Sequence, residues 1–177
     1  MTPSLLRHSL ARLCDSIDEQ TCTDWEHIIA VDEPSGRLDD VAHPQRKILW
    51  CGRHRDWGNT PRWMAWDHAQ GDYLLYIDDD NYLADPDVLD TLRFVTGPVA
   101  LFPLEVEGKF VHPLPVEVGR SDGNGLIVRR DIGRWPVSDR RSADGELIAA
   151  LVSAHPACPV YDDRALVVYE RARLGAV

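Results

Sequence analysis

The sequence lacks three features that would each point to a particular class of protein. It has no apolar run near the ~20 residues of a membrane-spanning helix and no signal peptide, so we expect no transmembrane segment. Its 4 cysteines form no C-x-x-C pair, which argues against a zinc knuckle or a disulfide framework and favours reduced thiols in the cytoplasm. With 19 basic against 29 acidic residues, non-specific binding to nucleic acid or anionic membranes is not expected, because both require basic patches.

The chain has instead the size and composition of one globular domain. Its 177 residues, of which 44% are hydrophobic, are enough to bury a core without disulfide or metal staples. No repeat, low-complexity tract or linker divides it, so residues 1–177 are expected to form a single domain. The formal net charge of −10 also fits the recruitment of metal cations.

Segments with the apolar spacing of helices alternate with short apolar segments that are typical of strands. Thr60-Pro61 and Asp85-Pro86 each combine an N-cap residue with a proline in the first turn, where helices begin. The patterns predict helices over about 4–20, 60–70, 85–94 and 142–153, and strands over 27–31, 47–51, 73–77, 98–104, 109–112, 126–129 and 165–169. This alternation predicts an α/β fold, a Rossmann-like mixed and mostly parallel sheet flanked by helices.

Three consecutive carboxylates, Asp78-Asp79-Asp80, directly follow the apolar strand over 73–77. They therefore lie at the carboxyl end of a strand, where open α/β sheets bind ligands. In an extended backbone Asp78 and Asp80 project to one side and Asp79 to the other. Two carboxylates on one side repel each other unless a cation lies between them, and Mg²⁺ or Mn²⁺ suits such oxygen ligands. The alternative is an acidic turn that caps the next helix, although Asp85 already supplies a cap.

The residues around this triplet resemble a known enzyme family. Residues 69–81, AQGDYLLYIDDDN, resemble the A-x-G-D-Y-(apolar)-D-D-D segment of family 2 glycosyltransferases, which have the GT-A fold. Residues 16–21, SIDEQT, resemble the family's S-(apolar)-x-x-Q-T, and residues 25–35, WEHIIAVDEPS, resemble its E-(apolar)₃-V-D-D-x-S. The similar segments occur in the family's order from about residue 5 to about residue 95, with a weaker resemblance to about residue 150.

The resemblance implies a hexosyltransferase-type enzyme that moves a sugar from a nucleotide-diphosphate donor, expected to be a UDP-sugar, to an acceptor hydroxyl with inversion. It implies that Asp78 and Asp80 hold Mn²⁺ or Mg²⁺ on the donor diphosphate, where a cation stabilises the charge of the leaving phosphate. Asp32, Asp79 and Arg62 are the residues expected to contact the nucleotide sugar. From the residues alone, Asp32 is equally a turn-capping residue and Arg62 an exposed surface residue.

Inverting transfer also needs a carboxylate that takes the proton of the acceptor hydroxyl. The family supplies this base from an E-D pair at the start of a later helix, and the resemblance assigns it to Asp144. Ala143 stands where the family usually has Glu. An Asp in the first turn of a helix is also common simply as a partner of the helix dipole, and Glu146 is the fallback base.

Two features between the triplet and Asp144 have more than one interpretation. The glycine-rich turn over 121–125 suits the close approach of a donor sugar, or forms a hairpin loop. Trp135 presents its ring to an acceptor sugar, or packs in the core. Trp63 and Trp66 are interpreted as packing residues.

The family begins with an apolar strand and a P-T-x-x-R turn, whereas Met1-Thr2-Pro3-Ser4 here precedes the first helix at once. We therefore expect the first strand to be absent, which leaves an open sheet edge that invites pairing with another chain, including a second copy in a homo-oligomer.

Two other functions stay open at this point. One is a nucleotide-sugar or carbohydrate-binding module with impaired catalysis. The other is a phosphotransferase or phosphatase of the haloacid-dehalogenase type, which also places D-x-D after a strand but usually has Thr or Val where this chain has Tyr82. The sequence does not identify the acceptor as a glycan, lipid, protein or small molecule.

Overall fold

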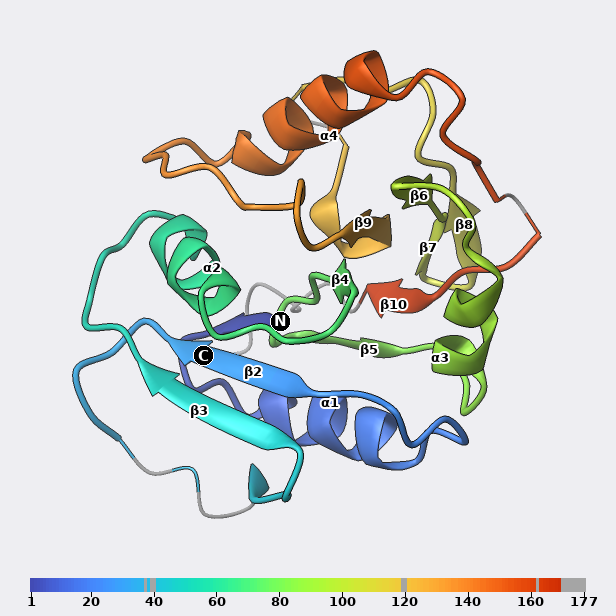
Figure 1. Ribbon diagram of the computed structural model, residues 1–177. Coiled ribbons are helices and arrows are strands. Elements are labelled where there is room, and N and C mark those ends of the chain that lie inside the picture. Colours follow the sequence, from blue (N-terminus) through green and yellow to red (C-terminus); the bar gives the residue numbers. More distant parts are fainter. Residues whose placement is uncertain (37, 39–40, 119–120, 162, 170–177) are drawn as a thin grey trace.

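The computed structural model describes residues 1–36, 38, 41–118, 121–161 and 163–169 as a mixed α/β fold (Figure 1). The strands are β1 (Thr2–Ser4), β2 (His27–Val31), β3 (Arg46–Trp50), β4 (Tyr73–Leu75), β5 (Asn81–Leu83), β6 (Val99–Leu101), β7 (Leu104–Val106), β8 (Lys109–Val111), β9 (Leu126–Arg129) and β10 (Val167–Tyr169). The helices are α1 (Ser9–Asp18), α2 (Asn59–Trp66), α3 (Val88–Thr91) and α4 (Ala143–Ala154), with single 3-10 turns at η2 (Leu92–Phe94) and η3 (Gly123–Gly125). The α/β class predicted from the sequence is confirmed.

β1, β2 and β3 are parallel, in line with the largely parallel first half predicted from the sequence, whereas β4 and β5 pair antiparallel with strands of the second half. β1, β2 and β3 pair in parallel in the order β1-β2-β3, whereas β4, β9 and β6 pair antiparallel in the order β4-β9-β6. The two sets meet at Met1, whose amino group donates to the Leu75 carbonyl at 2.7 Å and whose carbonyl accepts from the Ile77 N–H at 3.1 Å. This is the bonding pattern of parallel neighbours, so β1 lies between β2 and the chain around β4.

The expected absence of the first strand is wrong. Thr2–Ser4 pairs in register with residues 29–31 of β2, and its three residues are buried. The strand carries no apolar run because two of its three buried side chains bear hydroxyls with polar partners: the Thr2 hydroxyl lies 2.9 Å from His27 Nε2, and the Ser4 hydroxyl donates to Asp79. Because β1 lies between two neighbouring strands, the strand expected to be missing no longer provides an open sheet edge for pairing with another chain.

Several predicted elements are shorter in the structure or divided. The first helix begins at Ser9 instead of about residue 4, because residues 2–4 are strand and Leu6 has a φ of 60°. The second ends at Trp66, and its cap is the Asp56 carboxylate, which accepts the Thr60 N–H at 2.8 Å, so Thr60 is not the N-cap. The segment over 98–104 divides into β6 and β7, and β5 directly follows the acidic triplet, where no strand was predicted.

Helices cover both faces of the parallel strands, and β2 connects the two cores (Figure 1). Ile29 and Val31 pack with the apolar face of α1, while Ile28 and Ala30 pack with α2 and α4 on the other face. All four side chains are buried, and each large one contributes about 1.5–3 kcal/mol relative to an exposed position. This two-sided burial fixes where β2 ends, and therefore where Asp32 lies.

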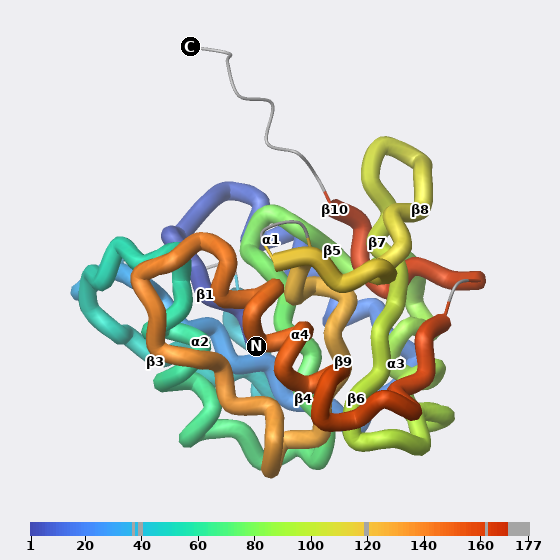
Figure 2. Tube along the Cα trace, turned by 90° about the horizontal axis from the view of Figure 1, so that it is seen from above, coloured from blue at the N-terminus to red at the C-terminus, as the bar shows by residue number. Residues whose placement is uncertain are grey.

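A four-stranded sheet in the order β5-β10-β7-β8 completes the fold. Seen from above, β3 and α2 lie at one side of the molecule and the β7–β8 hairpin at the other, with α4 over the middle (Figure 2).

All four cysteines are free thiols. No helix in the described ranges has the length and apolar character needed to cross a membrane.

Candidate functional site

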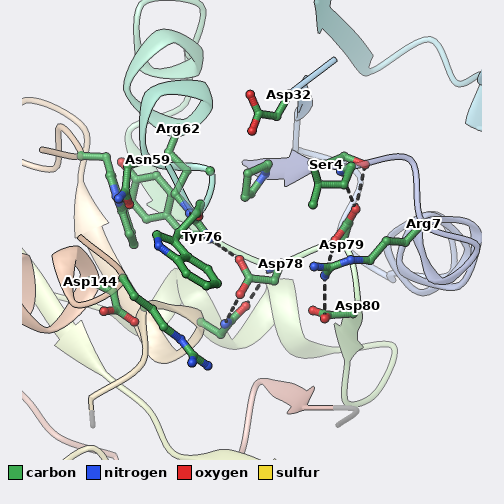
Figure 3. Close-up of a pocket in the computed structure, with 18 of the residues that line it drawn as sticks. Ser4, Arg7, Asp32, Asn59, Arg62, Tyr76, Asp78, Asp79, Asp80 and Asp144 are labelled. Atoms are coloured by element: carbon green, nitrogen blue, oxygen red, sulfur yellow. Dashed lines mark hydrogen bonds and ion pairs between the residues drawn. The ribbon is translucent and has the colours of Figure 1, made fainter. Parts of the chain in front are cut away.

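A cavity of about 700 Å³ lies at the carboxyl ends of β1 and β2 and of the segment after β4 (Figure 3). It brings together the residues that the sequence favoured for catalysis, metal binding or donor binding: Asp32, Arg62, Asp78, Asp79, Asp80 and Asp144. Glu146, the fallback base, is not among the lining residues, and its carboxylate accepts from Ser142 and Arg140. The carboxyl ends of parallel strands in an open α/β sheet are the usual place for a ligand.

Asp79 is turned towards the segment after β1 (Figure 3). Its side chain is buried and accepts hydrogen bonds from the Ser4 hydroxyl at 2.9 Å and the Leu5 N–H at 3.0 Å. Arg7 completes this set at 2.9 Å. Burial raises the pKa of Asp79, and the Arg7 charge and the two hydrogen bonds oppose the rise. Asp79 therefore holds the end of β1 against the acidic triplet.

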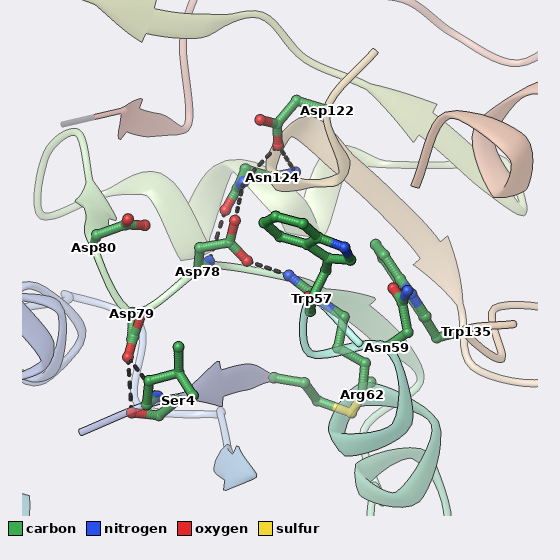
Figure 4. Close-up of polar contacts among 12 residues, drawn as sticks. Ser4, Trp57, Asn59, Arg62, Asp78, Asp79, Asp80, Asp122, Asn124 and Trp135 are labelled. Atoms are coloured by element: carbon green, nitrogen blue, oxygen red, sulfur yellow. Dashed lines mark hydrogen bonds and ion pairs between the residues drawn. The ribbon is translucent and has the colours of Figure 1, made fainter. Parts of the chain in front are cut away.

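Asp78 is held by residues of the glycine-rich turn (Figure 4). Its backbone N–H donates to Asn124 Oδ1 at 2.8 Å, and Asn124 Nδ2 lies 3.3 Å from Asp78 Oδ2. Asp122 accepts from both the backbone N–H and the side-chain amide of Asn124. Burial raises the pKa of Asp122, and the nearby charge of Asp78 adds to this rise. The sequence analysis considered only the glycines of this turn and did not predict that Asn124 and Asp122 hold Asp78 in place.

The glycines of the same turn are explained by packing. A Cβ on Gly125 would lie 2.2 Å from the Phe102 carbonyl oxygen, and one on Gly123 would lie 2.7 Å from the Trp135 ring. Trp135 is buried in the core, which was one of the two interpretations of this residue. The centre of its ring lies 4.7 Å from that of Tyr76, and its Nε1–H donates to Asn59 Oδ1 at 2.8 Å. It nevertheless forms part of the cavity wall.

Arg62 is buried, so the surface position considered for it is wrong. Its guanidinium pairs with the Asp78 carboxylate, donates to the Trp57 carbonyl at 3.0 Å and lies over the Trp135 ring at 4.5 Å. Asp80 has a comparable cationic neighbour, because Arg7 Nη1 lies 2.6 Å from its Oδ2. Each carboxylate of the D-x-D pair therefore has an arginine beside it.

Asp32 is also buried and does not cap its own turn. Its Oδ1 accepts the His54 N–H at 2.7 Å and its Oδ2 lies 3.4 Å from the Arg55 N–H, so it fixes the loop between β3 and α2. The same loop carries Trp57, which lines the cavity and which the sequence did not single out as a site residue. In the sequence Trp57 appears only as a loop tryptophan beside a glycine, a pattern too common to predict a binding site by itself.

Asp144 lies in the first turn of α4, across the cavity from Asp79 and Arg7 (Figure 3). Burial raises its pKa to about 6, and the charges of Asp122 and Asp78 add to this effect. The N–H of Gly145 donates to its Oδ1 at 2.7 Å. A carboxyl group with this pKa is ionised at neutral pH and remains basic enough to accept a proton.

The described residues contain no group of three or more His, Cys, Asp or Glu side chains that would hold a metal ion by themselves. Asp78 and Asp80 nevertheless offer carboxylate oxygens to one cavity, which are the ligands that Mg²⁺ and Mn²⁺ prefer. Their arginine partners show that positive charge is favourable beside both. The donor set therefore fits a hard divalent cation that shares its remaining positions between a ligand's oxygens and water.

Comparison with protein-family models and with curated proteins found no match. Among solved structures, S. aureus TarS 1-349 in complex with UDP-GlcNAc is similar with a TM-score of 0.72 and 16% identity, over 99% of this chain and 58% of that one. The mannosyltransferase PcManGT from Pyrobaculum calidifontis, in complex with GDP-Man and Mn²⁺, is similar with a TM-score of 0.69 and 16% identity, over 98% and 56%. A longer S. aureus TarS structure gives 0.72 and 15%, over 97% and 36%.

These similarities show the fold, which is GT-A-like. The chain spans 36–58% of the length of the proteins it resembles.

Proposed function

We propose that this chain is a glycosyltransferase that moves a sugar from a nucleoside diphosphate, with a UDP-sugar as the expected donor, to an acceptor hydroxyl with inversion. One observation carries the proposal: a single cavity in a GT-A-like fold holds the carboxylates of Asp78 and Asp80 together with Asp144, whose pKa is raised to about 6. The similar solved structures that contain UDP-GlcNAc, or GDP-Man with Mn²⁺, support it.

The donor end of the cavity is assigned to Asp78, Asp80, Arg62 and Asp32. Asp78 and Asp80 would hold Mn²⁺ or Mg²⁺, which when bound offsets the negative charge that develops on the leaving diphosphate. Arg62 is placed to contact the same diphosphate, since a guanidinium binds phosphate oxygens in a bidentate manner. Asp32 keeps free lone pairs on its carboxylate for a ribose hydroxyl or a base N–H.

Asp79 contributes to donor binding through position. It holds Ser4 and Leu5, which line the cavity, and so fixes the cavity floor next to the expected diphosphate. Direct contact with the nucleotide sugar, the role predicted for it from the sequence, would require one of these hydrogen bonds to be exchanged. We therefore assign Asp79 to positioning.

Asp144 is assigned as the base. As the acceptor oxygen bonds to the anomeric carbon, the bond from that carbon to the diphosphate oxygen breaks, and its electron pair leaves with the nucleoside diphosphate. The proton of the acceptor hydroxyl goes to the Asp144 carboxylate. Attack from the face opposite the leaving group inverts the anomeric centre, so the product carries the configuration opposite to that of the donor.

The proposal is tested with UDP-GlcNAc and GDP-Man, with and without Mn²⁺. Calorimetric titration measures nucleotide binding, and release of UDP or GDP measures transfer or hydrolysis. Asp80→Ala should abolish the Mn²⁺-dependent part of both, whereas Asp131→Ala, an exposed carboxylate paired with Arg129 outside the cavity, should behave as wild type. Unchanged turnover in Asp80→Ala would overturn the assignment.

The same titration separates the two other functions. Nucleotide-sugar binding without turnover would indicate a binding module with impaired catalysis. Hydrolysis of a phosphate monoester without nucleotide binding would indicate a phosphotransferase or phosphatase.

A further inference from the structure

Trp57 lies in the cavity with 62% of its surface exposed and a left-handed backbone, φ 63°. In Figure 4 its ring lies across the cavity between Asp78 and Trp135. A left-handed conformation is uncommon for a residue other than glycine, and unusual backbone conformations persist where the surroundings enforce them, often at ligand sites. Exposure of a large ring inside a polar cavity calls for a ligand that covers it.

The loop that carries Trp57 is held firmly in place. The Asp56 carboxylate caps α2 through Thr60, and Arg62 donates to the Trp57 carbonyl. On the other side, Gly58 packs against Pro3 so closely that a Cβ on Gly58 would lie 2.7 Å from the Pro3 Cβ. A ring fixed in this way costs little entropy when a ligand stacks on it, because it is already positioned.

Arg141 adds a positive charge beside this ring. Its guanidinium carbon lies 5.3 Å from the centre of the Trp57 ring, and it lines the same cavity. Arg7, Arg53 and Arg62 in the cavity wall each pair with a carboxylate, whereas Arg141, like Arg55, pairs with none in the part of the chain that the structure describes. In a chain of net charge −10, a cavity arginine without an acidic partner is suited to an anionic ligand.

Arg141 is close in sequence to the candidate base, and the Trp57 ring lies beside Arg141. Arg141 lies two residues before the start of α4 and three residues before Asp144, the group assigned to accept the proton of the acceptor. The donor diphosphate is assigned to the part of the cavity beside Asp78 and Asp80. Trp57 and Arg141 are both exposed, so they lie at the open part of the cavity, where a second substrate enters once the donor covers the floor.

We propose that Trp57 and Arg141 form the acceptor subsite, and that the acceptor is an anionic carbohydrate, a sugar ring that carries a phosphate or a carboxylate. This inference rests on the proposed glycosyl transfer. The indole ring covers the apolar face of the sugar, and the guanidinium binds the anionic group through paired N–H donors. The anionic group thereby holds the sugar hydroxyl against Asp144.

The experiment measures binding of glucose 6-phosphate, glucuronate and glucose by saturation-transfer NMR, to the free protein and to the protein saturated with UDP and Mn²⁺. We expect at least one of the two anionic sugars to bind about tenfold more tightly than glucose. Comparison of the two anionic sugars distinguishes a phosphate from a carboxylate. Trp57→Ala should weaken all three, and Arg141→Gln should remove the preference for the anion without changing the affinity for UDP.

Two matched variants serve as controls. Phe94→Ala removes another exposed aromatic ring and Arg140→Gln another exposed arginine, both outside the residues that line the cavity, and both should bind the sugars as wild type does. Equal affinity for glucose and both anionic sugars, or no binding of any of them in either state, would overturn the proposal. So would a loss of UDP affinity in Arg141→Gln that matches its loss of sugar phosphate affinity.

The outcome also separates this inference from the proposed function. If the wild type binds the anionic sugars but no nucleotide, the proposed glycosyl transfer is overturned and the binding site for an anionic sugar is kept. If it binds UDP with Mn²⁺ but none of the sugars, the acceptor subsite fails and the donor assignment stands.

Discussion

Ser4 and Asp79, 75 positions apart in the sequence, are joined by a hydrogen bond of 2.9 Å from the serine hydroxyl to Oδ2 of the carboxylate. The middle residue of the acidic triplet thereby ties the end of β1 to the segment after β4. The triplet is not extended, as the sequence pattern assumed, but enters a turn in which the Asn81 N–H donates to the Asp78 carbonyl at 3.1 Å. In this turn Asp79 faces the end of β1, while the Asp78 and Asp80 carboxylates line the cavity. One row of three carboxylates thus serves both the fold and the candidate site.

Replacing Asp79 should therefore lower the free energy of unfolding by more than replacing Asp80. Asp79→Ala leaves a buried hydroxyl and a backbone N–H without their acceptor and removes one of the two carboxylates that pair with Arg7, and we expect the free energy of unfolding to fall by about 2–4 kcal/mol. Asp80→Ala breaks one pair with the partly exposed Arg7 and should cost less than about 1 kcal/mol. Urea denaturation measures both values. Equal losses for the two variants would contradict this division of roles.

Asn124 should matter for metal-dependent binding because it orients Asp78. Asn124→Ala removes the acceptor for the Asp78 N–H and the amide beside its carboxylate, and we expect the Mn²⁺-dependent affinity for UDP to fall about tenfold or more. The matched control is Gln20→Ala, another buried side-chain amide that bonds three backbone groups far from the cavity. Calorimetry on both variants gives the answer, and an equal effect in the control would refute an orienting role.

The sequence predicted β2 and the acidic triplet well, because apolar runs and consecutive carboxylates are visible without tertiary contacts. It missed β1 because the strand buries hydroxyls, and a hydroxyl is suited to burial only once its partner is known. For Thr2 that partner is His27, and for Ser4 it is Asp79. Periodicity of apolar residues cannot register such a strand.

The same reason explains which site residues could be predicted. Asp32, Asp78 and Asp144 each follow a strand predicted from the sequence or open a helix, so local patterns together with the family resemblance were enough to select them as residues that line the cavity. Nothing local connects Trp57 to Arg141, since their proximity depends on how α2 and α4 pack around the cavity. The left-handed φ of Trp57 also runs against its intrinsic preference, so that conformation is set by tertiary contacts.

The rate of transfer should depend on pH through Asp144. Burial raises its pKa to about 6, and a base must be ionised to take a proton. We expect kcat/KM to rise as the pH increases through about 6 and to level off above about 7. The affinity for UDP with Mn²⁺, measured over the same range, separates this effect from donor binding. A rate that stays flat or falls through this range, at constant UDP affinity, would exclude Asp144 as the base.

Asp144→Asn should abolish transfer and yet stabilise the protein at neutral pH. The pKa of Asp144 is raised from 3.8 to about 6 in the folded state, so the folded protein holds an extra proton between these values and loses stability as the pH rises through them. The asparagine has no charge to bury. We therefore expect the free energy of unfolding of the variant to exceed that of the wild type by about 1 to 3 kcal/mol at pH 8, and not to exceed it below pH 3.8.

Denaturant unfolding at both pH values measures this difference, and Asp131→Asn, an exposed carboxylate whose pKa is lowered by Arg129, should show no gain at pH 8. A first-turn Asp that served only as a partner of the helix dipole would behave in the opposite way, because its ionised form would stabilise α4 and its replacement would destabilise the protein at pH 8. The sign of the change at pH 8 therefore decides between a helix-dipole partner and a carboxylate whose ionisation the fold tolerates at a cost in stability, as expected of a catalytic base.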